Sequence, residues 1–170
     1  MKELSQQEKS HPTRSISWAL LALLARVIVG GVLVVLGTIK AWDPVDFLRQ
    51  IHAYEIFPPG LWMNLMAAVL PWMEIGLGLM LLSGIMVREA ALLTAGLLFV
   101  FTAAVTWRAA AIHAQTGLAW CLIQFDCGCG TGVVKFCRKI GENLFLFLLA
   151  CFLIWKPGTW TVFKGVVRSR

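Results

Sequence analysis

The sequence has 170 residues, of which 59% are hydrophobic and 14% are charged, and its formal net charge is +6. A soluble domain carries roughly 25% charged residues. The composition therefore excludes an ordinary soluble domain and indicates an integral membrane protein, whose positive charge reflects membrane topology rather than nucleic-acid binding.

The pattern of apolar residues predicts an all-α fold, a bundle of four transmembrane helices. A spanning helix needs about 20 mostly apolar residues. The segments that meet this requirement are 18–39, 61–82, 90–112 and 136–155. Together they predict one membrane domain.

We expect the membrane domain to cover residues 18–156, between a polar cytoplasmic N-terminus (1–17) and a basic cytoplasmic tail (157–170). The first apolar segment contains Arg26 and lacks a small-residue cleavage site at its end, so we expect a retained helix rather than a cleaved signal peptide.

Basic residues predict the orientation of the bundle in a bacterial inner membrane. With both termini in the cytoplasm, the inner side carries Lys2, Lys9, Arg14, Arg88, Lys156, Lys164, Arg168 and Arg170. The outer side then carries Lys40, Arg49, Arg108, Lys135, Arg138 and Lys139. The small excess on the inner side favours cytoplasmic termini, and the basic tail suits anionic membrane lipid.

In the first outer loop, Asp43 and Pro44 form a typical helix N-cap and first helical residue. The residues that follow are amphipathic and predict a short interfacial helix that ends before Pro58-Pro59 and lies over the second outer loop. Lys40, at the end of the first span, has two interpretations: it stabilises a thiolate in that loop, or its ammonium group extends to the membrane surface.

Two charged residues lie within the first two spans, and we expect them to form an ion pair. Arg26 lies about 12 Å from the inner end of the first span, and Glu74 lies about 18 Å from the outer end of the second. Charges inside a membrane usually mark a buried pair or a functional site. The pair has two open interpretations: it fixes helix packing, or it lines a polar pocket for a quinone-like headgroup or a proton relay.

The second outer loop contains the sequence Asp126-Cys127-Gly128-Cys129-Gly130. On the oxidising side of a membrane, two such cysteines can cycle between a dithiol and a disulfide, a change of two electrons, or stay bridged. A ring closed by cysteines separated by one residue is strained, and strained, exposed disulfides are the labile ones. The sequence therefore favours Cys127 and Cys129 as a redox pair, and a structural bridge is the alternative.

Three further cysteines accompany this pair. Cys121 and Cys137 flank it as auxiliary thiols that resolve a mixed disulfide or form another bridge, although Cys121 is also explained as a membrane-facing residue. The basic Arg138-Lys139 would favour the Cys137 thiolate. Cys151, deep in the last span, is expected to act as a small apolar residue. The spacing matches no common zinc site, so we predict no metal.

The pattern of Arg26, Gly30, Gly37, Lys40, Asp43-Pro44, Pro71-Trp72-Met73-Glu74 and Asp126-Cys127-Gly128-Cys129 resembles the DoxX-like membrane proteins, specifically their MauE-type branch. The resemblance covers nearly the whole chain. It implies a four-helix membrane protein. MauE members are linked to methylamine utilisation and to disulfide formation or processing of a periplasmic dehydrogenase subunit, beside a thioredoxin-like protein. DoxD and DoxX relatives belong to a thiosulfate:quinone oxidoreductase, which implies quinone as a cofactor.

The chain departs from the usual pattern of this branch at several positions. Gly130 replaces the phenylalanine that usually follows the second cysteine, Glu142-Asn143 replaces an Arg-Asn pair, and Cys137 is an addition. These departures leave the exact partner and substrate open.

The hypothesis is a membrane thiol–disulfide oxidoreductase. Cys127 and Cys129 exchange electrons with a periplasmic thioredoxin-like or other thiol protein, with Arg26, Lys40, Asp43, Glu74 and Asp126 as supporting polar residues. The alternative is a non-enzymatic membrane subunit or maturation factor with a structural disulfide. The glycines of the first two spans are compatible with a homodimer.

Overall fold

The computed structural model describes residues 12–55, 60–127 and 132–156. Cys129, most of the N-terminal segment, Pro58-Pro59 and the tail from residue 157 lie outside the described residues. The five α-helices are α1 (Pro12–Trp42), α2 (Pro44–Ala53), α3 (Leu61–Ser83), α4 (Val87–Thr116) and α5 (Phe136–Trp155). A short 3₁₀ segment η1 (Trp120–Leu122) and the strands β1 (Gln124–Asp126) and β2 (Val133–Lys135) lie between α4 and α5.

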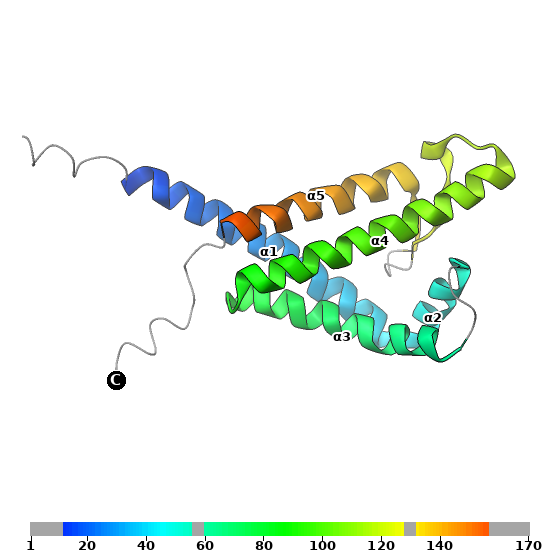
Figure 1. The fold of residues 1–170 in the computed structure, drawn as a ribbon, viewed down its shortest axis with the longest axis horizontal. Helices are drawn as coiled ribbons and strands as arrows, with labels where there is room; N and C mark the ends of the chain where they lie inside the picture. Colours follow the sequence, from blue (N-terminus) through cyan, green and yellow to red (C-terminus); the bar gives the residue numbers. More distant parts are fainter. Residues whose placement is uncertain (1–11, 56–59, 128–131, 157–170) are drawn as a thin grey trace, which may run out of the picture.

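The long helices α1, α3, α4 and α5 run side by side along the molecule (Figure 1). The short helix α2 and the two strands lie together at one end of this bundle, which we call the hairpin end. The beginning of α1 and the end of α5 lie at the opposite end. The fold is therefore all-α apart from one small hairpin, and Cys121, Cys127 and Cys137 lie at the hairpin end.

Among the described residues, three helices are long and apolar enough to cross a membrane, by length and composition: Trp18–Trp42, Leu61–Ser83 and Val87–Thr116. Large apolar side chains cover their outer surface, including Leu24, Val35, Leu92 and Phe99. A surface of this kind suits contact with lipid rather than with water. The remaining long helix, α5, is 20 residues long but carries Arg138, Lys139 and Glu142 near its start.

Contacts between the backbones of α1 and α3 fix the register of these two helices. A Cβ atom added at Gly30 would lie 2.9 Å from the carbonyl oxygen of Gly78, and one added at Gly37 would lie 2.8 Å from that of Pro71. Glycine is therefore required at these positions for the close approach. Gly30, Gly37 and Gly78 thus allow α1 and α3 to pack closely, whereas a Cβ at Gly31 would meet nothing within 4 Å.

The helix predicted after Asp43 is present as α2. Asp43 Oδ1 accepts a hydrogen bond of 2.9 Å from the backbone N–H of Asp46, and Pro44 is the first helical residue. This is the side-chain cap that the sequence predicted. On the inner side of α2, the Phe47 ring is buried, so the amphipathic pattern of the sequence corresponds to packing against the bundle.

Candidate redox site

Two short strands flank the Cys-Gly-Cys segment along the chain. Strands β1 and β2 are antiparallel, with Gln124 opposite Lys135 and Asp126 opposite Val133. Cys127 directly follows β1 and therefore begins the turn of the hairpin. The sequence analysis did not predict these strands, because three residues are too few for a periodic pattern to be recognised.

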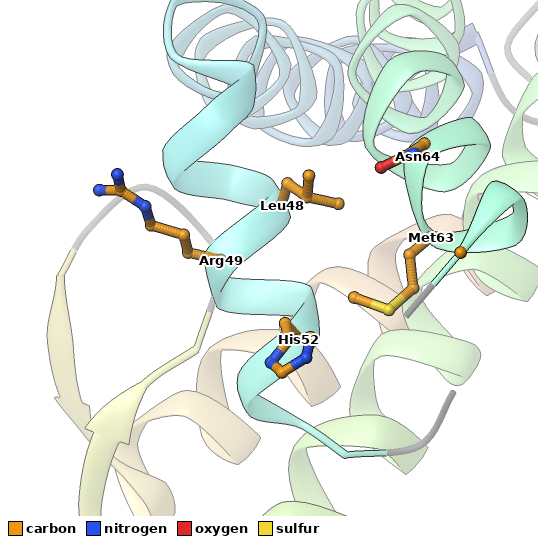
Figure 2. Close-up of a pocket in the computed structure, with 6 residues that line it drawn as sticks. Leu48, Arg49, His52, Met63 and Asn64 are labelled. Carbon is orange, nitrogen blue, oxygen red and sulfur yellow. The ribbon is translucent and has the colours of Figure 1, made fainter. Parts of the chain in front are cut away.

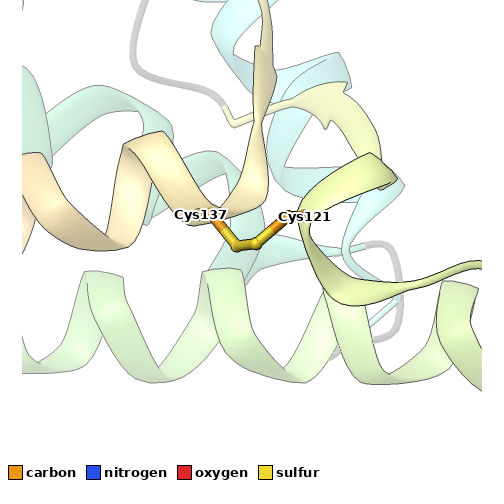
Figure 3. Close-up of a disulfide and its surroundings, with 2 residues drawn as sticks. All are labelled: Cys121 and Cys137. Carbon is orange, nitrogen blue, oxygen red and sulfur yellow. A yellow bond between two sulfur atoms is a disulfide. The ribbon is translucent and has the colours of Figure 1, made fainter.

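A disulfide between Cys121 and Cys137 closes the base of the hairpin. The bond joins η1 to the first turn of α5 (Figure 3), and the two Cα atoms are 5.0 Å apart. This separation lies within the usual range for a disulfide. The Phe136 N–H also donates to the Ile123 carbonyl oxygen at 3.0 Å. Cys121 and Cys137 are therefore not free auxiliary thiols, and of the predicted possibilities the structure contains the additional bridge.

Cys127 is also disulfide-bonded, and its residue is 6% exposed. The cysteine predicted as its redox partner, Cys129, lies outside the described residues. Cys151 is a free, partly buried thiol within α5. Its position in the helix agrees with the expectation of a small apolar side chain.

Helix α2 lies against the turn of the hairpin. The Tyr54 hydroxyl donates a hydrogen bond of 2.7 Å to the Cys127 carbonyl oxygen. The Tyr54 ring also meets the Phe125 ring edge-on, with 6.5 Å between centroids, and the Gln50 amide donates to Asp126 Oδ2 at 3.4 Å. These contacts confirm the predicted packing of the first outer loop over the cysteine loop.

The buried position of Tyr54 keeps its hydroxyl in the neutral, hydrogen-bonding form. Burial raises the pKa of Tyr54 well above its usual value, and the nearby Asp126 carboxylate raises it further. A neutral phenol can donate its proton to a carbonyl oxygen, whereas a phenolate cannot. The contact between Tyr54 and the Cys127 backbone therefore persists across the physiological pH range.

Replacing Tyr54 by phenylalanine is expected to loosen the hairpin locally. The ring contact with Phe125 is kept, but a hydrogen bond worth about 1 kcal/mol is lost. Amide hydrogen exchange in β1 should therefore become roughly fivefold faster, as measured by mass spectrometry of the purified protein. Exchange in α1 serves as the internal control, and an unchanged rate in β1 would show that this bond does not hold the turn.

A buried charged cluster lies within the bundle, at the pair Lys40–Glu74. Lys40 of α1 and Glu74 of α3 form a salt bridge, and their side chains are only 4% and 2% exposed. The Lys40 ammonium also lies 4.8 Å from the centroid of the Phe101 ring and 5.3 Å from that of Phe47. Because the Lys40 charge is compensated by Glu74, the first of its two predicted roles, stabilising a thiolate in the cysteine loop, loses its main support. The burial of its side chain contradicts the second, an ammonium group that extends to the membrane surface.

The predicted ion pair between Arg26 and Glu74 was wrong. Arg26 is buried, but its Nε donates to the Leu81 carbonyl oxygen at 2.9 Å and its Nη2 approaches that of Leu82 at 3.4 Å. These carbonyl groups belong to the last turn of α3, where a cation is favourable. Arg26 therefore caps the C-terminal end of α3.

The register of α1 and α3 explains the error. Gly37 of α1 contacts Glu74, whereas Gly30 already contacts Gly78. Arg26 therefore lies further along α3, beside its end, and Lys40 is about 21 Å from Arg26 along the axis of α1. The depths of these residues in the membrane were counted from predicted helix ends. Such depths could not show which of the two cations, three or four turns apart on α1, lies opposite Glu74.

Two polar residues of α5 are buried in the bundle, and neither was predicted as a site residue. Lys139 is 6% exposed and interacts electrostatically with both Lys40 and Glu74. Asn143 is 4% exposed and donates to Thr102 Oγ1 at 3.3 Å. Their four-residue spacing places both on one face of the helix, and this signal was present in the sequence.

The family model described as methylamine utilisation protein MauE matches residues 18–156 of the chain. The chain belongs to the MauE family. No curated protein and no solved structure matches the chain significantly.

This MauE-family chain also has a pocket of about 290 Å³ between α2 and the start of α3. Figure 2 shows His52 of α2 and Met63 of α3 facing each other across this gap, while Arg49 extends from another side of α2. The lining residues are Leu48, Arg49, His52, Gly60, Met63 and Asn64. None of them was predicted as a site residue, and the pocket lies beside the hairpin site rather than within it.

No group of three or more His, Cys, Asp and Glu side chains is arranged to hold a metal ion in the part of this MauE-family chain that the structure describes. Cysteine chemistry at the hairpin and the buried cluster beneath α2 are therefore the two features on which a function can be argued.

Proposed function

We propose that this membrane protein of the MauE family is a thiol–disulfide redox protein whose exchanging pair is Cys127 and Cys129. The observation that carries the proposal is the disulfide-bonded state of Cys127, directly after β1 and against Tyr54 of α2. Cys127 lies at the hairpin end of the bundle. A partner thiolate attacks one sulfur and forms a mixed disulfide. A second thiol then resolves this mixed disulfide.

Four spans with both termini in the cytoplasm are part of this proposal. Helix α5 has 20 residues, which gives a length of about 30 Å and matches the apolar thickness of a bilayer. Its Lys139 and Asn143 side chains are buried rather than facing lipid. Trp18 and Phe152 are in ring contact, with 6.3 Å between centroids, at the end opposite the hairpin.

Exposed tryptophans support the same arrangement. Trp155 is 86% exposed near the beginning of α1, and Trp62 and Trp107 are 71% and 65% exposed on the half of the bundle nearer the hairpin. Tryptophan is enriched at the two surfaces of a membrane. In this arrangement the hairpin lies at the periplasmic face, where disulfides persist, and a periplasmic thioredoxin-like protein is the proposed partner.

A quinone is implied by the relatives that the sequence resembles, and the buried cluster fits its headgroup better than the predicted Arg26–Glu74 site. Among the described residues, Glu74 Oε2 has no hydrogen-bond partner although it is fully buried, and Lys139 lies nearby as a donor. Glu74 would accept a hydrogen bond from a quinol hydroxyl, and Lys139 would donate one to a quinone carbonyl oxygen. When bound, a quinone takes up two electrons and two protons.

The alternative is a maturation factor or subunit in which the Cys127 disulfide is a static bridge. The observation that favours it is the burial of Cys127, since access limits thiol exchange. The two proposals differ in the redox state of the pair in cells.

The experiment that tests the proposal measures this redox state in intact cells with a membrane-impermeant maleimide, before and after a reductant. A redox protein should contain a mixture of oxidised and reduced Cys127 and Cys129, and both should be labelled from outside. A pair that is always fully oxidised would support the static bridge. Labelling only after permeabilisation would contradict the proposed orientation.

A further inference from the structure

The two disulfides of the described region differ in exposure. Cys121 and Cys137 are both exposed residues, whereas Cys127 is 6% exposed. Thiol–disulfide exchange requires a thiolate to reach one sulfur atom directly. An external thiol therefore meets the bond at the base of the hairpin before it meets the sulfur of Cys127.

The surroundings of Cys137 indicate water rather than the apolar interior of a membrane. Lys135 precedes it in an exposed position, and the Arg138 side chain that follows is 79% exposed. Charged side chains are costly within the lipid core. Cys137 therefore lies beside charged, exposed side chains, and Cys121 is an exposed residue as well.

The two sulfur atoms of this bond are not equivalent. Cys137 is the second residue of α5, and the N-cap residue Lys135 makes no side-chain cap hydrogen bond there. Free backbone N–H groups at a helix N-terminus stabilise a thiolate. Cys121 lies in η1, which is only three residues long. Cys137 is therefore the better leaving group, and Cys121 is the sulfur that is attacked.

We propose that the Cys121–Cys137 disulfide is a second thiol-exchange site, which reacts with an external dithiol at Cys121 Sγ. The attacking thiolate forms a mixed disulfide with Cys121, the Cys121–Cys137 bond breaks, and Cys137 leaves as a thiolate. The second thiol of the reductant then displaces Cys121. The external dithiol loses two electrons and two protons and becomes a disulfide, and both cysteines become thiols.

This site acts independently of Cys127 in the folded hairpin. Three residue pairs separate the base from the turn, which corresponds to about 10 Å along the strands. Two sulfur atoms must approach to about 2 Å to bond, so Cys127 does not exchange directly with Cys121 or Cys137 in this conformation. The inference therefore does not rest on the exchange proposed for Cys127.

The test is the order in which the disulfides open in the purified full-length protein. The protein in detergent is treated with dithiothreitol for increasing times, quenched with maleimide, and each cysteine is quantified by mass spectrometry. We expect Cys121 and Cys137 to be labelled together, about tenfold faster than Cys127, while α-helical circular dichroism is unchanged. The proposal would be overturned if Cys127 were labelled first, or if Cys121 and Cys137 were labelled only on unfolding. In either case the Cys121–Cys137 bond would be structural.

Single variants test the direction of attack. Cys121→Ser leaves the Cys137 thiol, and Cys137→Ser leaves the Cys121 thiol. At neutral pH, iodoacetamide should alkylate Cys137 about tenfold faster than Cys121. Cys151 is free and present in both proteins, so its alkylation rate is the internal reference. Equal rates for the two thiols would contradict the assignment of Cys137 as the leaving group.

Discussion

Replacing Glu74 by glutamine is expected to lower the free energy of unfolding by about 3–5 kcal/mol. The reason is that Glu74 compensates the buried Lys40 ammonium, and the glutamine amide cannot do so. Lys139 lies close enough to repel Lys40, so the variant leaves two lysines together inside the bundle. The measurement is the midpoint of thermal unfolding in detergent, together with the amount of protein in the membrane.

Replacing the other member of the pair, Lys40→Met, should lower the free energy of unfolding by less than Glu74→Gln does. Glu74 is then left without Lys40 but still interacts favourably with Lys139. A difference between the two single variants would identify Lys139 as a member of the cluster. Equal losses of stability in the two variants would show that Lys139 is not a member of the cluster.

The double variant Lys40→Met/Glu74→Met separates structure from function. Replacing both members of a buried ion pair by apolar residues is often neutral for stability, so we expect most of the lost stability to return. If the cluster only fixes helix packing, the double variant should keep normal redox exchange. Loss of exchange in this stable variant would support a role in electron or proton transfer.

The surface ion pair Arg138–Glu142 provides a matched control. The Arg138 side chain is 79% exposed, and its Nε lies 2.8 Å from Glu142 Oε1. Exposed pairs of this kind contribute about 0–1 kcal/mol. Arg138→Gln should therefore leave the unfolding midpoint nearly unchanged, and a large effect would show that charge near the start of α5 matters in general.

The second large effect is expected on exchange rather than on stability. Either Cys127→Ser or Cys129→Ser should reduce exchange with a thiol partner to the background rate, because a single thiol cannot complete a two-electron exchange. The variant that keeps the attacking cysteine should also accumulate a mixed disulfide with its partner. Non-reducing electrophoresis of membranes, followed by mass spectrometry of the shifted band, detects and identifies this species.

Cys151→Ser is the control for this experiment, because Cys151 is a free thiol within α5. It should leave both exchange and abundance unchanged. If Cys127→Ser lowers the amount of protein but traps no partner in either variant, the static bridge is the better explanation of the Cys127 disulfide.

Local chemistry in the sequence was sufficient to predict the helices and the cap of α2. Apolar length predicted the positions of α1, α3 and α4, and Asp43-Pro44 predicted the start of α2. These features depend on neighbouring residues, so a single sequence contains the information. The family resemblance, which the match over residues 18–156 confirms, came from the same local motifs.

The partners of the buried charged residues could not be predicted from neighbouring residues in the sequence. Glu74 pairs with Lys40 rather than with Arg26 because glycine contacts set the register of α1 against α3. A shift of a few turns changes which residue lies opposite without changing the composition of either helix. The sequence showed which side chains need a partner, and only the packed bundle shows which partner each one has.

The cysteine loop shows the same division between local sequence and tertiary structure. The sequence by itself determined that a membrane chain carries a Cys-Gly-Cys segment beside two further cysteines. The tertiary structure decided that Cys121 bonds to Cys137 and that Tyr54 holds the Cys127 carbonyl oxygen. Both contacts join residues that are brought together by the antiparallel packing of α4 and α5 and by the docking of α2. Such distant pairings depend on how whole helices pack, which no local pattern of residues specifies.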